Sequence, residues 1–172
     1  MSTVFGLPAH PFLVHFPILS IPIVTLLVAV RAVVPSKRRV LGLPTAVLAA
    51  LTVVSVQLAV SSGDALEHHV PRSTLLERHT QLADGLRPLS ILVLVLVLGA
   101  VAFERRPVRE PDGEGGPAAR GSLWTRRLGA AFAVAALLTG VAATARLVQV
   151  GHAGAKATWS KVDMHSRQRP GP

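Results

Sequence analysis

The sequence predicts an all-α protein, a four-helix transmembrane bundle whose successive helices run up, down, up and down across the bilayer. Half of the 172 residues are hydrophobic and 16% are charged, and the mean hydropathy of +0.49 exceeds that of an ordinary soluble domain. The apolar residues form four runs of about 20 residues, each long enough for a helix that crosses about 30 Å of hydrocarbon. Because lipid cannot hydrogen-bond the backbone, such runs are expected to be helical.

The first helix contains two prolines that predict a bend. Pro17 and Pro22 cannot donate to the carbonyls of Leu13 and Ile18. No basic residue precedes Phe12 and no small-residue cleavage pattern follows, so we expect a retained helix rather than a secretory signal. The four helices are predicted at residues 12–34, 41–61, 82–103 and 128–150 of a single membrane domain, 1–172.

The second helix is predicted to continue beyond its apolar run. Gln57, Ser61, Asp64 and His68 follow one another at i, i+4, i+7 and i+11, which places them on one helical face. Pro71 is expected to stop this helix.

The third helix is predicted to begin ahead of its apolar run. The segment "TLLE", residues 74–77, has the spacing of a capping box, in which Thr74 and Glu77 would satisfy each other's backbone amides. His79 then lies in the opening turns. The fourth helix follows a predicted flexible loop, 104–127, whose centre "PDGEGGPAARG" cannot bury a core, and it is followed by a tail, 160–172.

Basic clusters orient the helices. Lys and Arg are concentrated in the first loop, "PSKRR", and in the third, "ERRPVREPDGEGGPAARGSLWTRR", which predicts that both are cytoplasmic and that both termini are external in a multi-pass protein of the cell membrane. The basic residues behind the net charge of +9 lie in short clusters between the apolar runs, with no nucleic-acid-binding module, so we expect the lipid bilayer as a partner and no nucleic acid. The absence of cysteine excludes disulfides, thiol-ligated iron–sulfur clusters and covalently attached haem.

All seven histidines fall on the predicted external side. His15, His68, His79 and His152 each lie at the external end of a different helix, so a bundle would let four helices offer one imidazole each to a common region. Imidazole is the commonest nitrogen ligand for metals, and its second ring nitrogen favours a carbonyl or carboxylate acceptor.

This cluster predicts a redox or metal-binding protein with a b-type haem, or as a less favoured choice copper or another metal ion, between histidines near the external face. The preferred ligands are His15 together with His79 or His152, and His10 and His68 are held in reserve. Arg146 is a cation within an apolar run, where it could meet a haem propionate, pair with Asp64 or extend to the headgroups.

The alternative is a non-catalytic accessory or scaffold protein that packs against a membrane protein partner or forms a homo-oligomer, with the histidines as interfacial polar groups. Under either hypothesis, Trp124 and Trp159 lie beside helix ends and are expected as interfacial anchors. A transporter and a hydrolase are less favoured, because there is no repeated pair of broken helices and no nucleophile motif.

Two motifs resemble those of a bacterial family of small four-helix integral membrane proteins classed as a domain of unknown function. The segment "HPFLVHFPI", residues 10–18, resembles that family's HPxxxHFPI signature, and "GHAGAKATW", residues 151–159, is similar to its closing GHxG element. The segments "SGD" and "ERH", residues 62–64 and 77–79, resemble its middle section. The resemblance implies a four-helix membrane protein with His10, His15, His79 and His152 in family positions, and it implies no activity.

Overall fold

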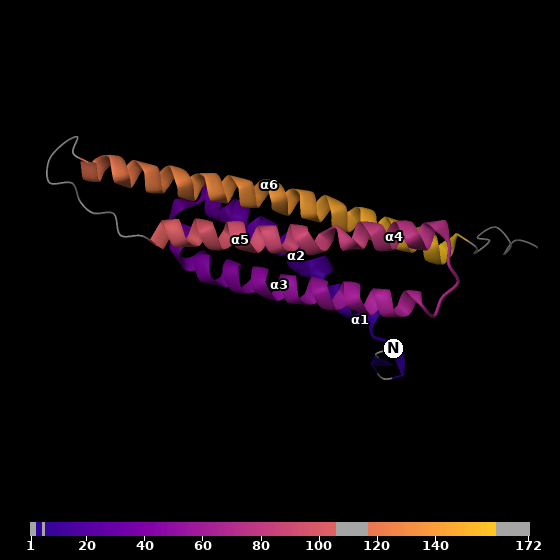
Figure 1. Cartoon of the computed structure of the whole chain (residues 1–172). Helices are drawn as coiled ribbons and strands as arrows, with labels where there is room; N and C mark the ends of the chain where they lie inside the picture. Colours follow the sequence, from indigo (N-terminus) through magenta and orange to yellow (C-terminus); the bar gives the residue numbers. More distant parts are fainter. Residues whose placement is uncertain (1–2, 5, 106–116, 161–172) are drawn as a thin grey trace, which may run out of the picture.

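The computed structural model describes residues 3–4, 6–105 and 117–160, and it confirms the predicted all-α class (Figure 1). A short antiparallel pairing of β1 (Thr3–Val4) with β2 (Leu7–Pro8) precedes the helices. The predicted tail beyond residue 160 and the loop residues 106–116 lie outside the described part of the chain. The helices are α1 (His10–Leu13), α2 (His15–Val33), α3 (Arg38–Glu67), α4 (Thr74–Asp84), α5 (Leu86–Arg105) and α6 (Pro117–Trp159), with a 3₁₀ turn η1 (Pro35–Lys37) before α3.

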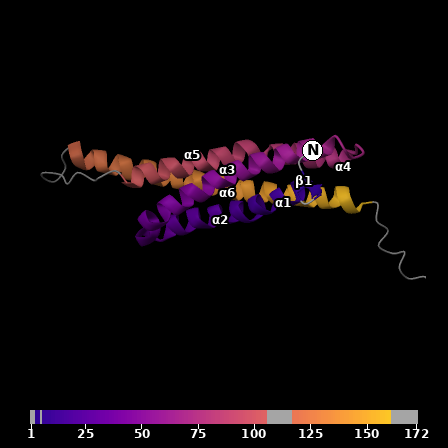
Figure 2. The ribbon, with the colours of Figure 1, turned by 90° about the horizontal axis from the view of Figure 1, so that it is seen from below.

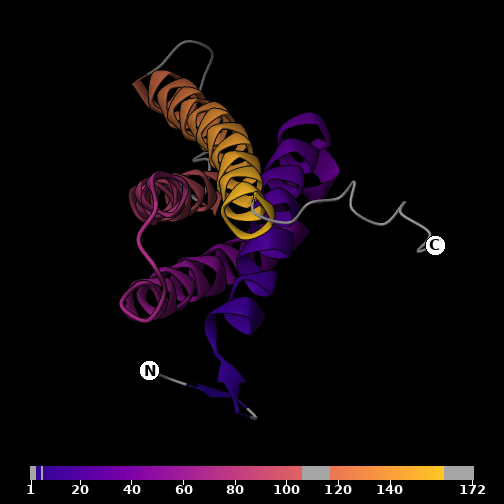
Figure 3. The ribbon, with the colours of Figure 1, turned by 90° about the vertical axis from the view of Figure 1, so that its right-hand side faces the viewer.

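These elements make four helical stretches that are long and apolar enough to cross a membrane, and they lie side by side along their length (Figures 1 and 3). Figure 2 shows α1 and β1 at the same end of the molecule as α4. The stretches are His10–Val33, Pro35–Glu67, Thr74–Arg105 and Leu123–Trp159. The sequence-predicted helices therefore exist, and each is longer than its apolar run.

Most of that extra length comes from residues that extend the helices beyond the ends of their apolar runs. As predicted from its polar face, α3 continues past residue 61 and ends at Glu67, before Pro71. In contrast, α5 ends at Arg105 and α6 begins at Pro117, so the expectation of a flexible loop over 104–127 is wrong for residues 104–105 and 117–127. Proline is tolerated in a first helical turn, and the alanine and arginine residues that follow favour helix, so the segment needs no apolar run to form one.

The start of α4 differs in one detail from the predicted capping box. The residue before the helix, Ser73, is extended, and its Oγ accepts a hydrogen bond of 3.2 Å from the backbone N–H of Leu76. Thr74 is already helical, so its side chain is not in the capping position. The helix begins at the predicted residue with the neighbouring hydroxyl as its cap.

Of the two prolines expected to bend the first stretch, one lies beside a break in the helix. The helix is interrupted at Val14, next to the carbonyl of Leu13 that Pro17 deprives of its helical donor. Pro22 lies within α2 without interrupting it. The interruption separates the short α1, which carries His10, from the long α2.

Small side chains hold the helices close together at the centre of the bundle. Gly140 on α6 faces Thr25 on α2, where an added Cβ would lie 2.7 Å from the Thr25 Oγ1, and Gly99 on α5 faces the ring of Phe132. Valine and alanine dominate the buried cluster: Val24, Val28, Ala46, Ala49, Val93, Val97, Val101 and Ala136. Close backbone approach through small residues is typical of helix packing in membranes.

Candidate functional site

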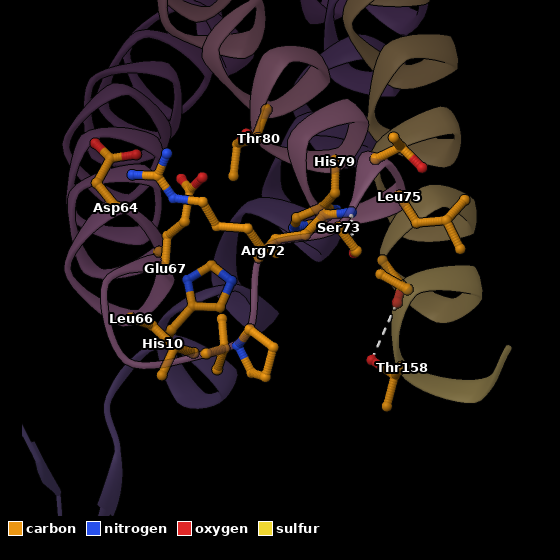
Figure 4. A pocket seen from close by; sticks show the side chains of 18 of the residues that line it. His10, Asp64, Leu66, Glu67, Arg72, Ser73, Leu75, His79, Thr80 and Thr158 are labelled. Atoms are coloured by element: carbon orange, nitrogen blue, oxygen red, sulfur yellow. Dashed lines mark hydrogen bonds between the residues drawn. The ribbon is translucent and has the colours of Figure 1, made fainter. Parts of the chain in front are cut away.

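Two cavities lie at the end of the bundle where α1, the end of α3, α4 and the end of α6 meet. The outer cavity has a volume of about 620 Å³ and a partly polar lining. The inner one has a volume of about 200 Å³ and a mainly apolar lining. They share five wall residues, so they adjoin each other: His10, Val60, His79, Ala83 and Gly154. Figure 4 shows the outer cavity, with Asp64 and Glu67 on the α3 side and Thr158 on the α6 side.

His10 reaches across from α1 to the backbone of α3. Its Nδ1 lies 2.9 Å from the carbonyl oxygen of Ala59 and 3.2 Å from the Oγ of Ser62. Its ring packs on Gly63, where an added Cβ would come within 3.0 Å of the ring. Because a carbonyl oxygen only accepts, Nδ1 carries a proton, and in the neutral form of the ring the lone pair is then on Nε2.

His79 repeats this arrangement between α4 and α6. Its Nδ1 lies 3.0 Å from the carbonyl oxygen of Val150, and an added Cβ on Gly154 would come within 3.0 Å of the ring. In both cases the imidazole donates to a helical carbonyl and packs on the glycine four residues further along that helix. Each glycine therefore provides the space that its histidine needs.

His10 and His79 both line the wall that the two cavities share, and each has its Nδ1 bonded to a helical carbonyl. Within the described part of the chain, neither Nε2 atom has a hydrogen-bond partner. An Nδ1–H bonded to a carbonyl is the usual means by which a protein orients an imidazole whose Nε2 binds a metal. The pair can therefore offer two oriented nitrogen donors beside an apolar space.

The expected convergence of four imidazoles from four helices is not what the structure shows. His15, His68 and His152 are exposed, and none of them lines either cavity. His152 precedes Gly154 by two residues, which is a rotation of about 200° around the helix, so it faces away from the side that meets His79. The structure brings together His79 and His10, the latter a reserve choice in the sequence-based prediction.

Arg146 does not line either cavity and does not pair with Asp64. Its guanidinium lies over Gly85, between α4 and α5, where an added Cβ would be 2.7 Å from Nε. That Nε is buried, and it has no hydrogen-bond partner among the residues that the structure describes. The expected role beside a haem propionate is therefore without structural support, because the side chain lies against the helix junction.

Asp64 pairs with Arg87, which the sequence analysis overlooked. The Nη2 of Arg87 lies 2.8 Å from Asp64, and its Nε lies 3.6 Å from Asp84 one turn earlier. Arg87 falls within a predicted apolar run, as Arg146 does. Its spacing of three residues from Asp84 could have indicated an ion pair on one helical face. Gly63 and Gly154 lie in the "SGD" and GHxG motifs, but their contacts with the histidines were not predicted, because a glycine's neighbours are set by packing between helices.

Histidine, cysteine and acidic residues do not form a complete site for a bare metal ion in the described ranges. No group of three or more of these residues there could hold one. The two imidazoles supply the nitrogen ligands at the cavities, and two such ligands suit a group that brings further donor atoms of its own. Comparisons with protein-family models, curated proteins and solved structures gave no match for this chain, so its function must be inferred from this geometry.

Proposed function

We propose that this protein is a multi-pass membrane protein, with four helices running up, down, up and down, that holds a b-type haem between His10 and His79 and serves in electron transfer. The observation that carries the proposal is the matched orientation of the two imidazoles, each donating through Nδ1 to a helical carbonyl at 2.9–3.0 Å and keeping Nε2 available. Axial ligation of non-covalent haem needs one or two such nitrogens.

The surroundings of the pair also suit a haem. The inner cavity is lined by apolar side chains such as Val56, Leu86 and Leu147, which match the apolar macrocycle. The outer cavity adds polar groups, including Arg72 and Thr158, which are suited to the propionates. A porphyrin supplies four nitrogens itself, so two protein ligands suffice. Copper or another bare ion is less favoured, because it would take more ligands from the chain.

The membrane arrangement supports a location of this site near the external face. Four helical stretches can cross a bilayer by length and composition, and the basic loops lie at the ends opposite the histidine pair in the predicted topology. Membership of the domain-of-unknown-function family resembled by "HPFLVHFPI" and "GHAGAKATW" is part of this proposal and rests on those motifs alone.

The visible spectrum of the purified protein tests the haem. The full chain, extracted in mild detergent from haem-replete cells, is expected to show a Soret band and, after reduction, the sharp α and β bands of a low-spin haem with two imidazole ligands. A colourless preparation that also fails to take up added haemin would contradict the proposal.

Single cysteines test the topology, since the natural chain contains none. Ser36→Cys and Ser160→Cys place thiols at exposed positions at opposite ends of the helices. A membrane-impermeant maleimide added to intact cells is expected to label the second variant and to label the first only after the cells are opened. The reverse pattern would place the histidine pair on the cytoplasmic side.

The second candidate is an accessory or scaffold protein. The observation that favours it is the exposure of His15 and His152, which leaves both side chains accessible to a membrane protein partner or a second copy. In that case His15→Ala and His152→Ala should reduce co-purification of the partner or the oligomer, whereas His10→Ala and His79→Ala should not.

A further inference from the structure

A third cavity lies at the other end of the bundle, away from the histidines. It has a volume of about 550 Å³ and is formed by the end of α2, η1, the start of α3, the end of α5 and the described part of α6. Its lining includes three arginines and one carboxylate: Arg38, Arg39, Arg126 and Glu104. This cavity is separate from the proposed haem site and shares no lining residue with it.

The carboxylate of this cavity is already neutralised from within the bundle. Glu104 accepts a 2.7 Å hydrogen bond from Arg31, whose side chain is 4% exposed while that of Glu104 is 18% exposed. An anion entering the cavity would therefore meet the three arginines without strong repulsion from Glu104. The net charge that the lining presents is positive.

One of the arginines is held in place before any ligand arrives. The Nε of Arg38 donates to the carbonyl oxygen of Arg31 at 2.9 Å, and its Nη2 donates to that of Ala32 at 3.0 Å. These bonds cap the carboxyl end of α2, where a cation is favoured. Since a guanidinium has five N–H donors, further donors are left for a ligand. A phosphate group matches such a donor array.

Exposed apolar side chains adjoin the lining residues of this basic cavity in the sequence. Val33, Val40 and Trp124 are sequence neighbours of lining residues, and they are 76%, 70% and 64% exposed. A soluble anion would leave these apolar side chains exposed to water, whereas the acyl chains of a bound lipid would cover them. Basic pockets between transmembrane helices on the cytoplasmic side are a known means of binding anionic headgroups.

We propose that this cavity binds the phosphate headgroup of an anionic phospholipid, with Arg38, Arg39 and Arg126 as its cationic contacts. The inference rests on the proposed membrane topology and does not depend on the histidine pair. A haem-free protein would therefore leave it intact, and a failure to bind lipid would leave the haem proposal intact.

The test compares two double variants that remove the same charge. Arg39→Gln with Arg126→Gln removes two lining arginines. Lys37→Gln with Arg127→Gln removes two exposed basic residues that lie within two positions of these arginines in the sequence and do not line the cavity. Each protein is incubated in detergent with phosphatidylglycerol or phosphatidylcholine, and bound lipid is measured by native mass spectrometry and by the shift in Tm.

The wild-type protein and the control variant are expected to retain phosphatidylglycerol in preference to phosphatidylcholine. The cavity variant should bind phosphatidylglycerol at least about tenfold more weakly, because two charge-assisted hydrogen-bonding groups are lost. Its Tm without lipid should match that of the control, which shows that it folds, and Arg126→Gln alone should give an intermediate loss. Equal weakening in both double variants would indicate unspecific charge attraction and overturn the proposal.

A soluble anion is the competing source of the same phosphate chemistry. Inorganic phosphate and glycerol phosphate, added without lipid, are expected to leave the Tm of the wild-type protein unchanged. Stabilisation by either one that equals the effect of phosphatidylglycerol would overturn the assignment to a lipid. A wild-type protein that binds both lipids equally would also overturn it.

Discussion

The two ends of the bundle use polar side chains in opposite ways. At one end, His10 and His79 donate to backbone carbonyls of α3 and α6 and keep a lone pair beside an apolar space. At the other end, the buried Arg31 pairs with the half-buried Glu104, and further arginines present charge to a cavity. The comparison indicates that the histidine end is suited to donating electron pairs to a ligand, and the arginine end to holding helices together and attracting anions.

The largest loss of stability is expected at the arginine end, from Glu104→Ala. This change leaves the buried guanidinium of Arg31 without its counter-charge, and breaking a buried ion pair in this way costs about 3 kcal/mol in the free energy of unfolding. Thermal unfolding in detergent measures the loss. Replacing both partners, with Arg31→Met and Glu104→Leu, should restore most of the stability, and a double variant as unstable as the single one would contradict this account.

A smaller effect is expected from the glycines that accommodate the imidazoles. In Gly154→Ala the new Cβ would come within 3.0 Å of the His79 ring, so the ring must move at a cost of about 1–2 kcal/mol. Haem content should fall along with stability. Gly63→Ala should act in the same way through His10.

Gly42→Ala is the matched control for these variants. It lies on the same helix as Gly63, it lines neither cavity at the histidine end, and a Cβ added there would make only ordinary van der Waals contact with Val101 at 3.6 Å. We expect it to retain haem and to be as stable as the wild type or slightly more so, since alanine is the better helix former. Equal haem loss in Gly42→Ala and Gly63→Ala would show that the close contact with the imidazole does not matter.

The smallest effect is expected for the ion pair at the histidine end. Arg87 and Asp64 are 33% and 49% exposed, so their attraction is screened, and Asp64→Asn should cost about 0.5 kcal/mol. Chemical or thermal unfolding of both variants, Asp64→Asn and Glu104→Ala, measures the difference in the free energy of unfolding between the two ends. A loss as large as that of Glu104→Ala would show that the two ends do not differ in the way described.

Features that depend on local sequence were predictable here. Apolar runs predicted the four helices, because length and hydropathy report directly on a segment, and the polar face through Asp64 predicted the extension of α3. The helix at residues 117–127 was missed, because its glycine- and proline-rich flank dominated the composition of the segment.

The pairing of histidines depended on contacts between distant segments. His10 and Ala59 are separated by 49 residues, and His79 and Val150 by 71, so the register of helix packing determines which imidazoles turn inward. Sequence position alone placed His15 and His152 at the correct end of their helices without revealing that they face outward. The same limit applies to Arg31 and Glu104, which are 73 residues apart.

The most direct test of the central claim is the haem content of four single variants prepared in the same way as the wild type. Each histidine is replaced by alanine in turn: His10, His79, His15 and His152. The account predicts that His10→Ala and His79→Ala lose the low-spin spectrum, whereas His15→Ala and His152→Ala keep it at wild-type haem content. Loss of the spectrum in His15→Ala or His152→Ala, with retention in His10→Ala and His79→Ala, would contradict it.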